Sequence, residues 1–348
     1  MKTGELQIEH YDFNLPEELI AQEALPNREA SRMLVIDRKT RSFSDRRFSE
    51  ITELLVAGDV LVINNTRVFP ARLNGMLESG GKMELLLERE LSPMVWETLA
   101  RPAKRLKEGK LIGFGEGLRA EVVEKTESGS IVVRFQCEGD FESVLESVGR
   151  TPLPPYIKRD VTTLDEDRIR YQTVYAKEKG SIAAPTAGLH FTPDVLNALT
   201  EKGVEIVEVT LHVGYGTFAP VRATDLSKHS VSGERCQITD QAAETINRAK
   251  EQGRRVIAVG TTSTRSLESF ADESGRVIPG RRIADLTITP GYKFKVIDGL
   301  LTNFHLPMSS LLVLVTSFGG YDLVMNSYRH AVSEKYRFYS YGDCMLIE

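Results

Sequence analysis

Between residues 69 and 140 the chain carries a series of short apolar segments separated by glycine, proline and polar turn residues. Roughly six of these segments follow one another at a spacing of about 8 to 12 residues, which is typical of a small β-sandwich or β-barrel. We expect strands at 71–77, 82–88, 95–100, 109–112, 118–124 and 131–135. The series predicts an all-β domain and constrains the fold more than any other feature of the chain.

On both sides of this series, strand signals alternate with helix signals. The near-continuous apolar run of Asp59–Asn65 predicts a central strand that is covered on both faces. Helices are expected at 193–202 and 240–252, where Thr192 and Thr239 are suitable N-caps, and each leads into a buried strand. This alternation is typical of an α/β domain.

The proline-rich segment Thr151–Tyr156 ends the all-β series and suits a domain boundary, because such a segment is stiff and extended. The chain has 348 residues, which favours about two domains. The predicted fold is therefore an α/β main domain with an inserted small all-β barrel domain. We expect residues 1–68 and 152–348 to form the discontinuous α/β catalytic domain, and residues 69–151 to form the insert.

Composition is that of an ordinary globular protein, with 41% hydrophobic and 27% charged residues. The longest apolar run, Leu311–Val315, is far shorter than the roughly 20 residues of a membrane span, and the charged N-terminal segment lacks the apolar stretch of a signal peptide. We therefore expect a cytoplasmic protein without a membrane partner. The formal net charge of -5 argues against indiscriminate binding to nucleic acid, although a local basic face such as Arg101–Lys107 remains compatible with it.

The sequence lacks the motifs of several common enzyme classes. It has no Gly-x-Ser-x-Gly elbow, no His-Glu-x-x-His pair, and no Gly-x-Gly-x-x-Gly loop after a strand. Cys137, Cys236 and Cys344 lie far apart without the spacing of a zinc site or a disulfide framework. We therefore expect an enzyme that uses neither a metal nor nicotinamide.

The loop Tyr171–Phe191 is a strong candidate for a functional segment. Pro185, Gly188 and the small residues between them leave the backbone little side-chain cover, so that a ligand can approach closely. The loop places His190 directly before the helix start at Thr192. An ordinary connector with a surface histidine explains the same residues about equally well.

Two further loops follow expected strands. His212 lies at the end of the strand 204–211, the place where open α/β sheets bind ligands, although a plain turn is an equal alternative. In the second loop, helix N–H groups, hydroxyls and a guanidinium could together bind a carboxylate or a phosphate. We favour this binding role over the alternative that the hydroxyls only cap the helix. The residues of this second loop are Thr261, Thr262, Ser263 and Arg265.

Two more segments combine polar side chains with the end of an apolar run. His305, in Asn303–Ser310, precedes a proline and paired hydroxyls that open a helix. Asn64, Asn65 and Arg67 follow a buried strand, where amides and a guanidinium can bind a base edge or a carboxylate. Turn chemistry alone would also select asparagine there. Together the loops favour a polar, anionic small molecule as ligand.

Several long motifs spread over nearly the whole chain carry a family resemblance. They are Asp12–Gln22, Ala30–Leu34, Asp59–Val68, Pro70–Arg72, Ala184–Phe191, Gly216–Arg222, Val259–Leu267, Thr302–Pro307 and Tyr336–Asp343. In these motifs and their order, the chain resembles the S-adenosylmethionine:tRNA ribosyltransferase-isomerases of queuosine biosynthesis. Members of that family have an α/β domain with an inserted β-barrel, in agreement with the strand spacing.

The resemblance implies a reaction and its partners. The ribosyl part of S-adenosylmethionine moves onto 7-aminomethyl-7-deazaguanine at the wobble position of a tRNA anticodon loop and rearranges to an epoxycyclopentane. The products are epoxyqueuosine-tRNA, adenine and methionine. S-adenosylmethionine is then a co-substrate, and no cofactor is implied. The oligomeric state stays open, with a monomer as the working expectation.

This chemistry suggests roles for the candidate residues. A base must remove a proton beside the sulfonium, protonation assists the departure of adenine, and the attacking amine must be neutral. The candidate acid and base groups are His190, His212 and His305. The candidate clamp for the methionine carboxylate is Arg265 with the neighbouring hydroxyls. The candidate substrate-binding residues are Asn64, Asn65, Arg67, Thr186, Thr261, Thr262, Ser263 and Arg265.

Two positions depart from the family pattern. The family's His-x-Met-His-x-Glu motif is His229–Glu234 here, with Ser232 in place of the second histidine, so no catalytic role is expected at that position. Met308 replaces a residue that is usually polar or charged, which weakens any claim that this side chain contacts substrate.

Two rival functions predict other features. An S-adenosylmethionine-dependent RNA methyltransferase predicts a glycine-rich loop after an early strand, and this sequence has none. A non-enzymatic RNA-binding module predicts excess basic charge and stacking aromatics, which the net charge of -5 and the 7% aromatic content disfavour.

Overall fold

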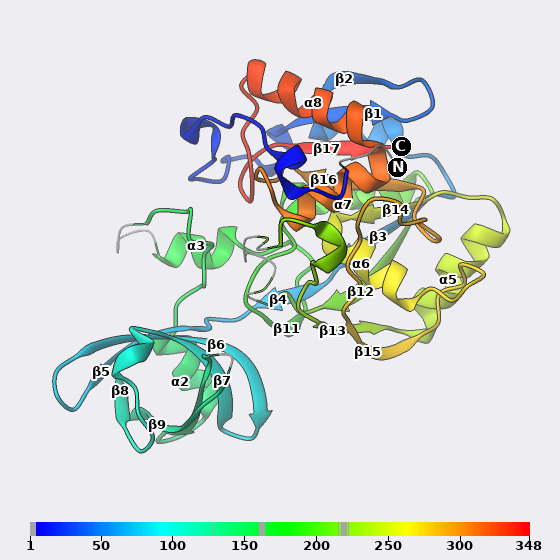
Figure 1. Ribbon diagram of the computed structural model, residues 1–348. Coiled ribbons are helices and arrows are strands. Elements are labelled where there is room, and N and C mark those ends of the chain that lie inside the picture. The colour runs from blue at the N-terminus through cyan, green and yellow to red at the C-terminus, as the bar shows by residue number, and fades with distance from the viewer. Residues whose placement is uncertain (1–4, 128, 160–163, 215, 217–220, 222) are drawn as a thin grey trace. The chain divides into compact units, whose positions relative to one another are not determined.

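The computed structural model describes residues 5–127, 129–159, 164–214, 216, 221 and 223–348. These residues form two compact units (Figure 1). Unit 1 consists of Met1–Arg67, Gln172–Glu178 and Ala184–Glu348, and unit 2 consists of Val68–Tyr171 and Lys179–Ala183. The chain passes between the units near the short strands β4 (Thr66–Val68) and β11 (Glu178–Ser181).

Unit 1 contains a mixed nine-stranded sheet with the strand order β15-β13-β12-β3-β14-β16-β17-β1-β2. Strands β12, β3, β14 and β16 pair in parallel, so their carboxyl ends lie at one edge of the sheet. The strand bounds are β1 Arg32–Asp37, β2 Ser42–Arg47, β3 Val60–Asn64, β12 Glu205–Leu211, β13 Glu234–Ile238, β14 Val256–Val259, β15 Gly280–Ala284, β16 Gly299–Asn303 and β17 Cys344–Ile347.

Helices cover this sheet, and every residue of β3 is buried. Because successive side chains of a strand point to opposite faces, β3 is covered on both faces, as its apolar run predicts. The side chains of Leu61, Ile63, Phe191 and Val259 belong to one large hydrophobic core. The helix bounds in unit 1 are α1 Ile51–Leu54, α4 Pro193–Glu201, α5 Asp240–Glu251, α6 Gly260–Phe270, α7 Ser310–Gly319 and α8 Tyr321–Ser333.

Capping chemistry sets the start of the two helices that the sequence predicts. The Thr192 hydroxyl accepts a hydrogen bond from the Val195 N–H at 3.3 Å and begins α4. The Thr239 hydroxyl accepts from the Ala242 N–H at 3.2 Å and begins α5. Both helices are confirmed. Each leads into a strand of the parallel sheet, β12 and β14, which establishes the α/β character of unit 1.

Unit 2 contains a closed antiparallel barrel with the strand order β10-β7-β6-β5-β8-β9. Its fully buried residues alternate with exposed ones along the strands, as Leu118, Ala120 and Val122 do on β9. The predicted barrel and its series of strands are therefore confirmed. The bounds are β5 Arg72–Leu77, β6 Lys82–Ser92, β7 Val95–Arg101, β8 Leu111–Gly115, β9 Leu118–Lys125 and β10 Ile131–Gln136, followed by α2 Phe141–Val148 and α3 Leu164–Arg170.

Candidate active site

A pocket lies in unit 1 at the carboxyl ends of β12, β14 and β16, the edge at which open α/β sheets bind ligands. Its cavity volume is about 50 Å³. We call it the strand-end pocket. Four of the predicted site residues line it, namely Thr186, Thr261, Thr262 and His305. The other lining residues are Ala184, Pro185, Ala187, Val213, Gly260, Thr302, Asn303, Leu311, Tyr339 and Ser340.

One wall of the strand-end pocket comes from a short 3-10 turn, Thr186–His190. Gly188 in this turn has no room for a side chain. A Cβ atom there would lie 2.0 Å from the Tyr175 hydroxyl oxygen and 2.8 Å from Thr173 Cγ2. The absence of a side chain at Gly188 therefore lets the turn pack directly on Tyr175, and this contact sets the position of the turn.

His190 ends the turn and is almost fully buried, with 4% of its surface exposed. Its Nδ1 atom lies 2.9 Å from the Ser31 hydroxyl oxygen, and its ring packs on Phe48 at a centroid distance of 5.3 Å. Nε2 is buried. Burial lowers the pKa of His190 to about 4, although a side-chain hydrogen bond with Asn303 opposes this shift. The ring is therefore neutral near neutral pH.

His305 lines the pocket and is held from two sides. Its Nε2 atom lies 2.9 Å from the Thr302 hydroxyl oxygen, and its backbone N–H donates to the Tyr328 hydroxyl at 3.0 Å. Burial lowers the pKa of this imidazole to about 3. His305 is thus a neutral ring near neutral pH, fixed within its own turn.

His212 follows β12 but does not line the strand-end pocket, although its neighbour Val213 does. Its Nδ1 atom lies 2.8 Å from the Thr66 hydroxyl oxygen. Burial, together with the charge of Arg235, lowers the pKa of His212 to about 4. The three histidines therefore share a neutral state. His305 lines the strand-end pocket, whereas His190 does not: it ends the turn whose first residues, Thr186 and Ala187, line the pocket.

The start of α6 forms a second wall of the pocket. Gly260 has a φ of +86°, which turns the chain sharply from β14 into the helix. Thr261 and Thr262 then face the pocket, and the buried Thr262 hydroxyl has no partner among the described residues. The hydroxyl of Ser263 instead donates to the Val259 carbonyl at 2.7 Å. Two of the hydroxyls expected in an anion clamp are therefore at the pocket, and the third is bonded within the helix.

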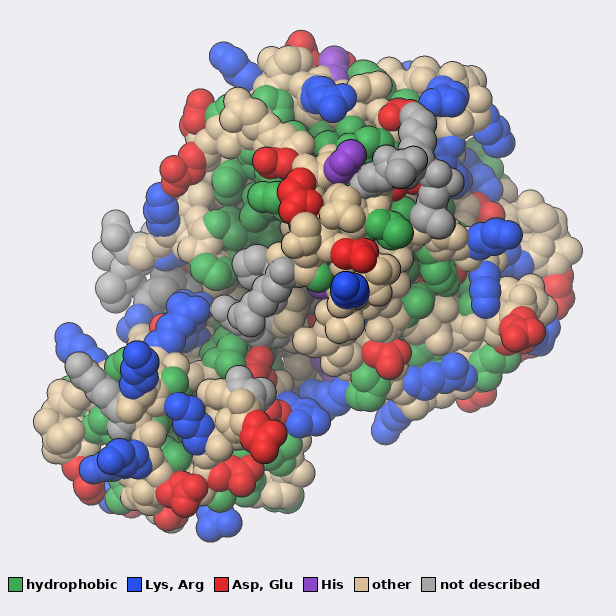
Figure 2. All heavy atoms as spheres, viewed as in Figure 1, with side chains coloured by type: hydrophobic (Ala, Val, Ile, Leu, Met, Phe, Trp, Pro, Cys, Tyr) green, Lys and Arg blue, Asp and Glu red, His purple; other side chains and the backbone are tan. Residues whose placement is uncertain are grey.

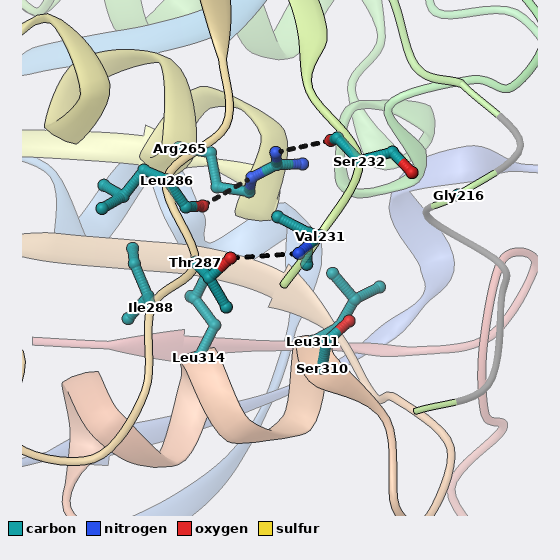
Figure 3. Close-up of a pocket in the computed structure, with 10 residues that line it drawn as sticks. All are labelled: Gly216, Val231, Ser232, Arg265, Leu286, Thr287, Ile288, Ser310, Leu311 and Leu314. Atoms are coloured by element: carbon teal, nitrogen blue, oxygen red, sulfur yellow. Dashed lines mark hydrogen bonds between the residues drawn. The ribbon is translucent and has the colours of Figure 1, made fainter. Parts of the chain in front are cut away.

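Arg265 lies in a neighbouring pocket, which shares Leu311 with the first (Figure 3). Its Nη1 atom donates to Glu234 Oε2 at 2.6 Å. Its Nη2 atom donates to the carbonyl oxygens of Ala284 and Ser232 at 2.9 and 3.3 Å, and its Nε atom donates to the Leu286 carbonyl at 3.3 Å. Both partners of the ion pair are buried. A carboxylate that binds Arg265 must therefore compete with Glu234, and the clamp stays a prediction.

Asn64, Asn65 and Arg67 are not brought to the strand-end pocket. Asn64 is fully buried: its Oδ1 accepts from the N–H groups of Leu211 and Thr66 at 3.0 and 3.2 Å, and its Nδ2 donates to the Leu211 carbonyl at 2.9 Å. Asn65 donates to Glu208 at 3.0 Å and lines a different hollow. Arg67 is exposed. Their predicted roles in substrate binding remain predictions.

The structure adds residues that the sequence argument did not single out for the site. Asn303 lines the pocket with 2% of its surface exposed, and Ser31 contacts His190. An asparagine that ends an apolar strand is the same signal that indicated Asn64, so Asn303 could have been found in this way. No local signal indicates Ser31. Within the motif Gly216–Arg222, Thr217–Pro220 and Arg222 lie outside the described residues.

Metal and membrane features were also searched in the described part of the chain. It contains no group of three or more His, Cys, Asp or Glu side chains that could hold a metal ion. None of its helices is long and apolar enough to cross a membrane. On the face shown in Figure 2, the Lys and Arg side chains are interspersed with Asp and Glu.

Comparison with known proteins connects this geometry to a family. The model of the family described as queuosine biosynthesis protein matches residues 8–347. The S-adenosylmethionine:tRNA ribosyltransferase-isomerase of Desulfitobacterium hafniense is 52% identical over 344 residues, which cover 98% of this chain and 100% of that protein. The protein of the same name from Syntrophotalea carbinolica is 51% identical over the same shares.

A solved structure is similar over the same length. The crystal structure of S-adenosylmethionine tRNA ribosyltransferase from Thermotoga maritima has 35% sequence identity and a TM-score of 0.55, and the match covers 97% of this chain and 100% of that one. Both comparisons therefore cover nearly the whole chain. The chain belongs to the queuosine biosynthesis protein family.

Proposed function

We propose that this chain is an S-adenosylmethionine:tRNA ribosyltransferase-isomerase. It transfers and isomerises the ribosyl moiety of S-adenosylmethionine onto 7-aminomethyl-7-deazaguanine in tRNA, giving epoxyqueuosine-tRNA, adenine and methionine. The observation that carries this proposal is the 52% identity over 98% of the chain to a protein of that name. S-adenosylmethionine acts as a co-substrate, without a further cofactor. The tRNA is bound through its anticodon loop, by a monomer in the cytoplasm.

The neutral histidines support the proton transfers that this reaction needs. A neutral imidazole can take the proton from the carbon beside the sulfonium. Burial that lowers the pKa of His305 to about 3 keeps this ring in the neutral form, but it also makes the ring a weaker base than an ordinary imidazole. His305 is a candidate because of its place in the pocket. His190 and His212, each with a pKa of about 4, are the other candidates.

Replacement of each histidine by glutamine tests these roles. Loss of general acid or base help is expected to lower turnover by about 10²- to 10⁴-fold, while circular dichroism checks that the variant is folded. A histidine whose replacement leaves turnover intact is removed from the mechanism. Exposed His10 offers a matched control, because its change to glutamine is expected to leave turnover unchanged.

The product analysis separates this function from the alternative, an S-adenosylmethionine-dependent RNA methyltransferase. The enzyme is incubated with S-adenosylmethionine and a tRNA that carries the aminomethyl-deazaguanine, and small molecules are analysed by chromatography. We expect free adenine and methionine in equal amounts. A tRNA with unmodified guanine at the same position serves as the control and should yield neither. Formation of S-adenosylhomocysteine would overturn the proposal.

A further inference from the structure

The start of α6 lacks the side-chain cap that three other helices of unit 1 have. The hydroxyls of Thr192, Thr239 and Ser309 cap α4, α5 and α7, each by accepting a hydrogen bond from a backbone N–H. Among the described residues, no side chain caps α6, which follows Val259 and begins at Gly260. The first N–H groups of an α-helix have no partner within the helix, and the helix dipole makes this end positive. The start of α6, which lines the strand-end pocket, is therefore open to a hydrogen-bond acceptor.

Thr262 adds a buried hydroxyl to this helix start. Only 8% of its surface is exposed, and its Oγ1 atom has no hydrogen-bond partner within the described part of the chain. The next two residues differ, because their hydroxyls are bonded to backbone carbonyls of the same segment. Ser263 donates to Val259 at 2.7 Å, and Thr264 donates to Gly260 at 3.2 Å. A buried hydroxyl without a partner is unfavourable, so Thr262 is expected to gain a partner when a ligand binds.

Gly260 shows where the Thr262 hydroxyl lies relative to the pocket. A Cβ atom built on Gly260 would lie 3.6 Å from Thr262 Oγ1 and 3.6 Å from Ala187 Cβ. Ala187 belongs to the turn that forms the other wall of the pocket, and all three residues line the pocket. The hydroxyl therefore lies beside the space between the two walls, next to the start of α6. A ligand atom in that space can reach both the helix N–H groups and the hydroxyl.

The groups at this helix start favour an anionic acceptor. Backbone N–H groups can only donate, a threonine hydroxyl can donate its hydrogen, and the helix end carries partial positive charge. None of the described lining residues is Lys, Arg, Asp or Glu, so an anion here needs a compensating charge on the same ligand. A cavity of about 50 Å³ suits a carboxylate better than a phosphodiester between two sugars. An amino acid head group, with an ammonium beside its carboxylate, meets both conditions.

We propose that the N–H groups at the start of α6 and the Thr262 hydroxyl bind the α-carboxylate of the methionyl part of S-adenosylmethionine. The choice of this ligand rests on the proposed function. The site differs from the clamp predicted from the sequence, because Arg265 is not part of it: its guanidinium is bonded to Glu234 and to three carbonyl oxygens in the neighbouring pocket. Glu234 also accepts from the Gly214 N–H at 2.9 Å, so this ion pair braces the chain just beyond β12 instead.

Replacement of Thr262 by valine tests the site, because valine has a similar shape and lacks the hydroxyl. Calorimetry measures the binding of S-adenosylmethionine and of decarboxylated S-adenosylmethionine to the full-length protein. Loss of the carboxylate is expected to weaken binding to the wild type by about 10- to 100-fold, and Thr262→Val should weaken the binding of S-adenosylmethionine by about 10-fold. Thr262→Val should bind the decarboxylated ligand as the wild type does, within about 3-fold, because the partner of the hydroxyl is absent.

Thr264→Val is the matched control, because Thr264 is a buried threonine of the same helix whose hydroxyl is bonded to the Gly260 carbonyl. We expect this variant to bind both ligands as the wild type does. Urea unfolding without ligand separates a binding role from a structural one. The midpoint should fall in Thr264→Val, which loses a hydrogen bond, and should stay equal or rise in Thr262→Val. A lower midpoint in Thr262→Val would show that its hydroxyl already has a partner in the free protein, and would overturn the proposal.

The coupling between the hydroxyl and the carboxylate decides the outcome. A loss in Thr262→Val that is confined to the ligand with the carboxylate supports the proposal. Equal losses for both ligands, or no loss for either, would overturn it, and so would weaker binding of modified tRNA alone, which would indicate a phosphate as the ligand.

The proposed function fails in a different way. Coupling in a wild type that releases no adenine from S-adenosylmethionine and modified tRNA would refute the proposed function and leave the carboxylate site standing. Adenine release without coupling at Thr262 would overturn the site alone. A wild type that does not bind S-adenosylmethionine at all would overturn both.

Discussion

Gly188 offers a sharp test of how the turn carrying His190 is positioned. A Cβ atom at this residue would lie 2.0 Å from the Tyr175 hydroxyl oxygen, 2.8 Å from Thr173 Cγ2 and 3.0 Å from Tyr175 Cζ. Because both neighbours are buried, neither can move into solvent. Overpacking of this kind lowers the free energy of unfolding by about 1 to 3 kcal/mol. We expect Gly188→Ala to fall at the upper end of that range.

The closest clash involves a single atom, so a second substitution can relieve it. Tyr175→Phe removes the hydroxyl oxygen, which has no hydrogen-bond partner among the described residues, and alone it is expected to change stability by less than about 1 kcal/mol. In the double variant the destabilisation by Gly188→Ala should shrink by about 1 kcal/mol or more, which is a coupling between residues in contact. Additive effects would refute the reasoning.

Urea unfolding followed by far-UV circular dichroism measures these changes. The single tryptophan, Trp96, lies on β7 of the barrel, so its fluorescence follows unit 2 separately. We expect Gly188→Ala to shift the transition followed by circular dichroism, and not the transition followed by tryptophan fluorescence. Gly113→Ala is the matched control: a Cβ atom there meets nothing within 4 Å, and a change of less than about 1 kcal/mol is expected. Turnover by Gly188→Ala should also fall, because the turn carries His190.

Two further predictions concern buried ionisable groups. Burial lowers the pKa of His305 from 6.5 to about 3, so stability should be constant above about pH 6.5 and fall on acidification, by up to about 1.4 kcal/mol per pH unit for this group. The slope of the free energy of unfolding against pH, measured below pH 6.5, should be smaller by about one proton in His305→Gln than in the wild type. An equal slope in the two proteins would contradict burial of a neutral ring. Glu234→Ala leaves the buried Arg265 without its carboxylate and should lower the free energy of unfolding by about 3 to 5 kcal/mol. Glu251→Ala removes an exposed pair with Arg276 and should change it by less than about 1 kcal/mol; similar losses in both would contradict the argument.

Much of the fold follows from local signals that need no knowledge of distant residues. The barrel strands are bounded by their own turns, and α4 and α5 begin at threonines that cap them. The strand β17 is different. It pairs with β16 and with β1, which lies some three hundred residues away in the sequence, and only the assembled sheet supplies both partners. A short apolar segment at the chain end carries no information about which strands it will join.

Strand β2 shows a second limit of local patterns. Its sequence is polar and five of its six residues are exposed, so it lacks the apolar alternation by which strands are predicted. Pairing with β1 makes it a strand nevertheless. As an edge strand it needs few apolar contacts, and its charged side chains protect the edge against pairing with other chains.

The candidate site depends even more on partners that sequence patterns do not reveal. Asn64 and Asn303 share one signal, an asparagine at the end of a buried strand. The backbone of Leu211 and Thr66 occupies the carbonyl oxygen of Asn64, because β12 lies directly beside β3. Asn303 meets different neighbours: its Nδ2 atom donates to the Tyr339 carbonyl at 2.9 Å, and the residue lines the strand-end pocket. The same residue type therefore braces the sheet in one place and lines a pocket in the other.

The histidines extend this argument from residue type to individual atoms. The sequence indicated His190 as a candidate because a loop of small residues places it directly before a helix start. Its chemistry, however, depends on whether Nδ1 or Nε2 carries the hydrogen. Its Nδ1 atom contacts the Ser31 hydroxyl, and Ser31 lies 159 residues earlier in the chain. The Ser31 hydroxyl also contacts the Arg28 carbonyl. This hydrogen-bond partner of His190 is brought to it only by the folded chain, so the sequence could indicate the histidine but not the contact that holds its ring.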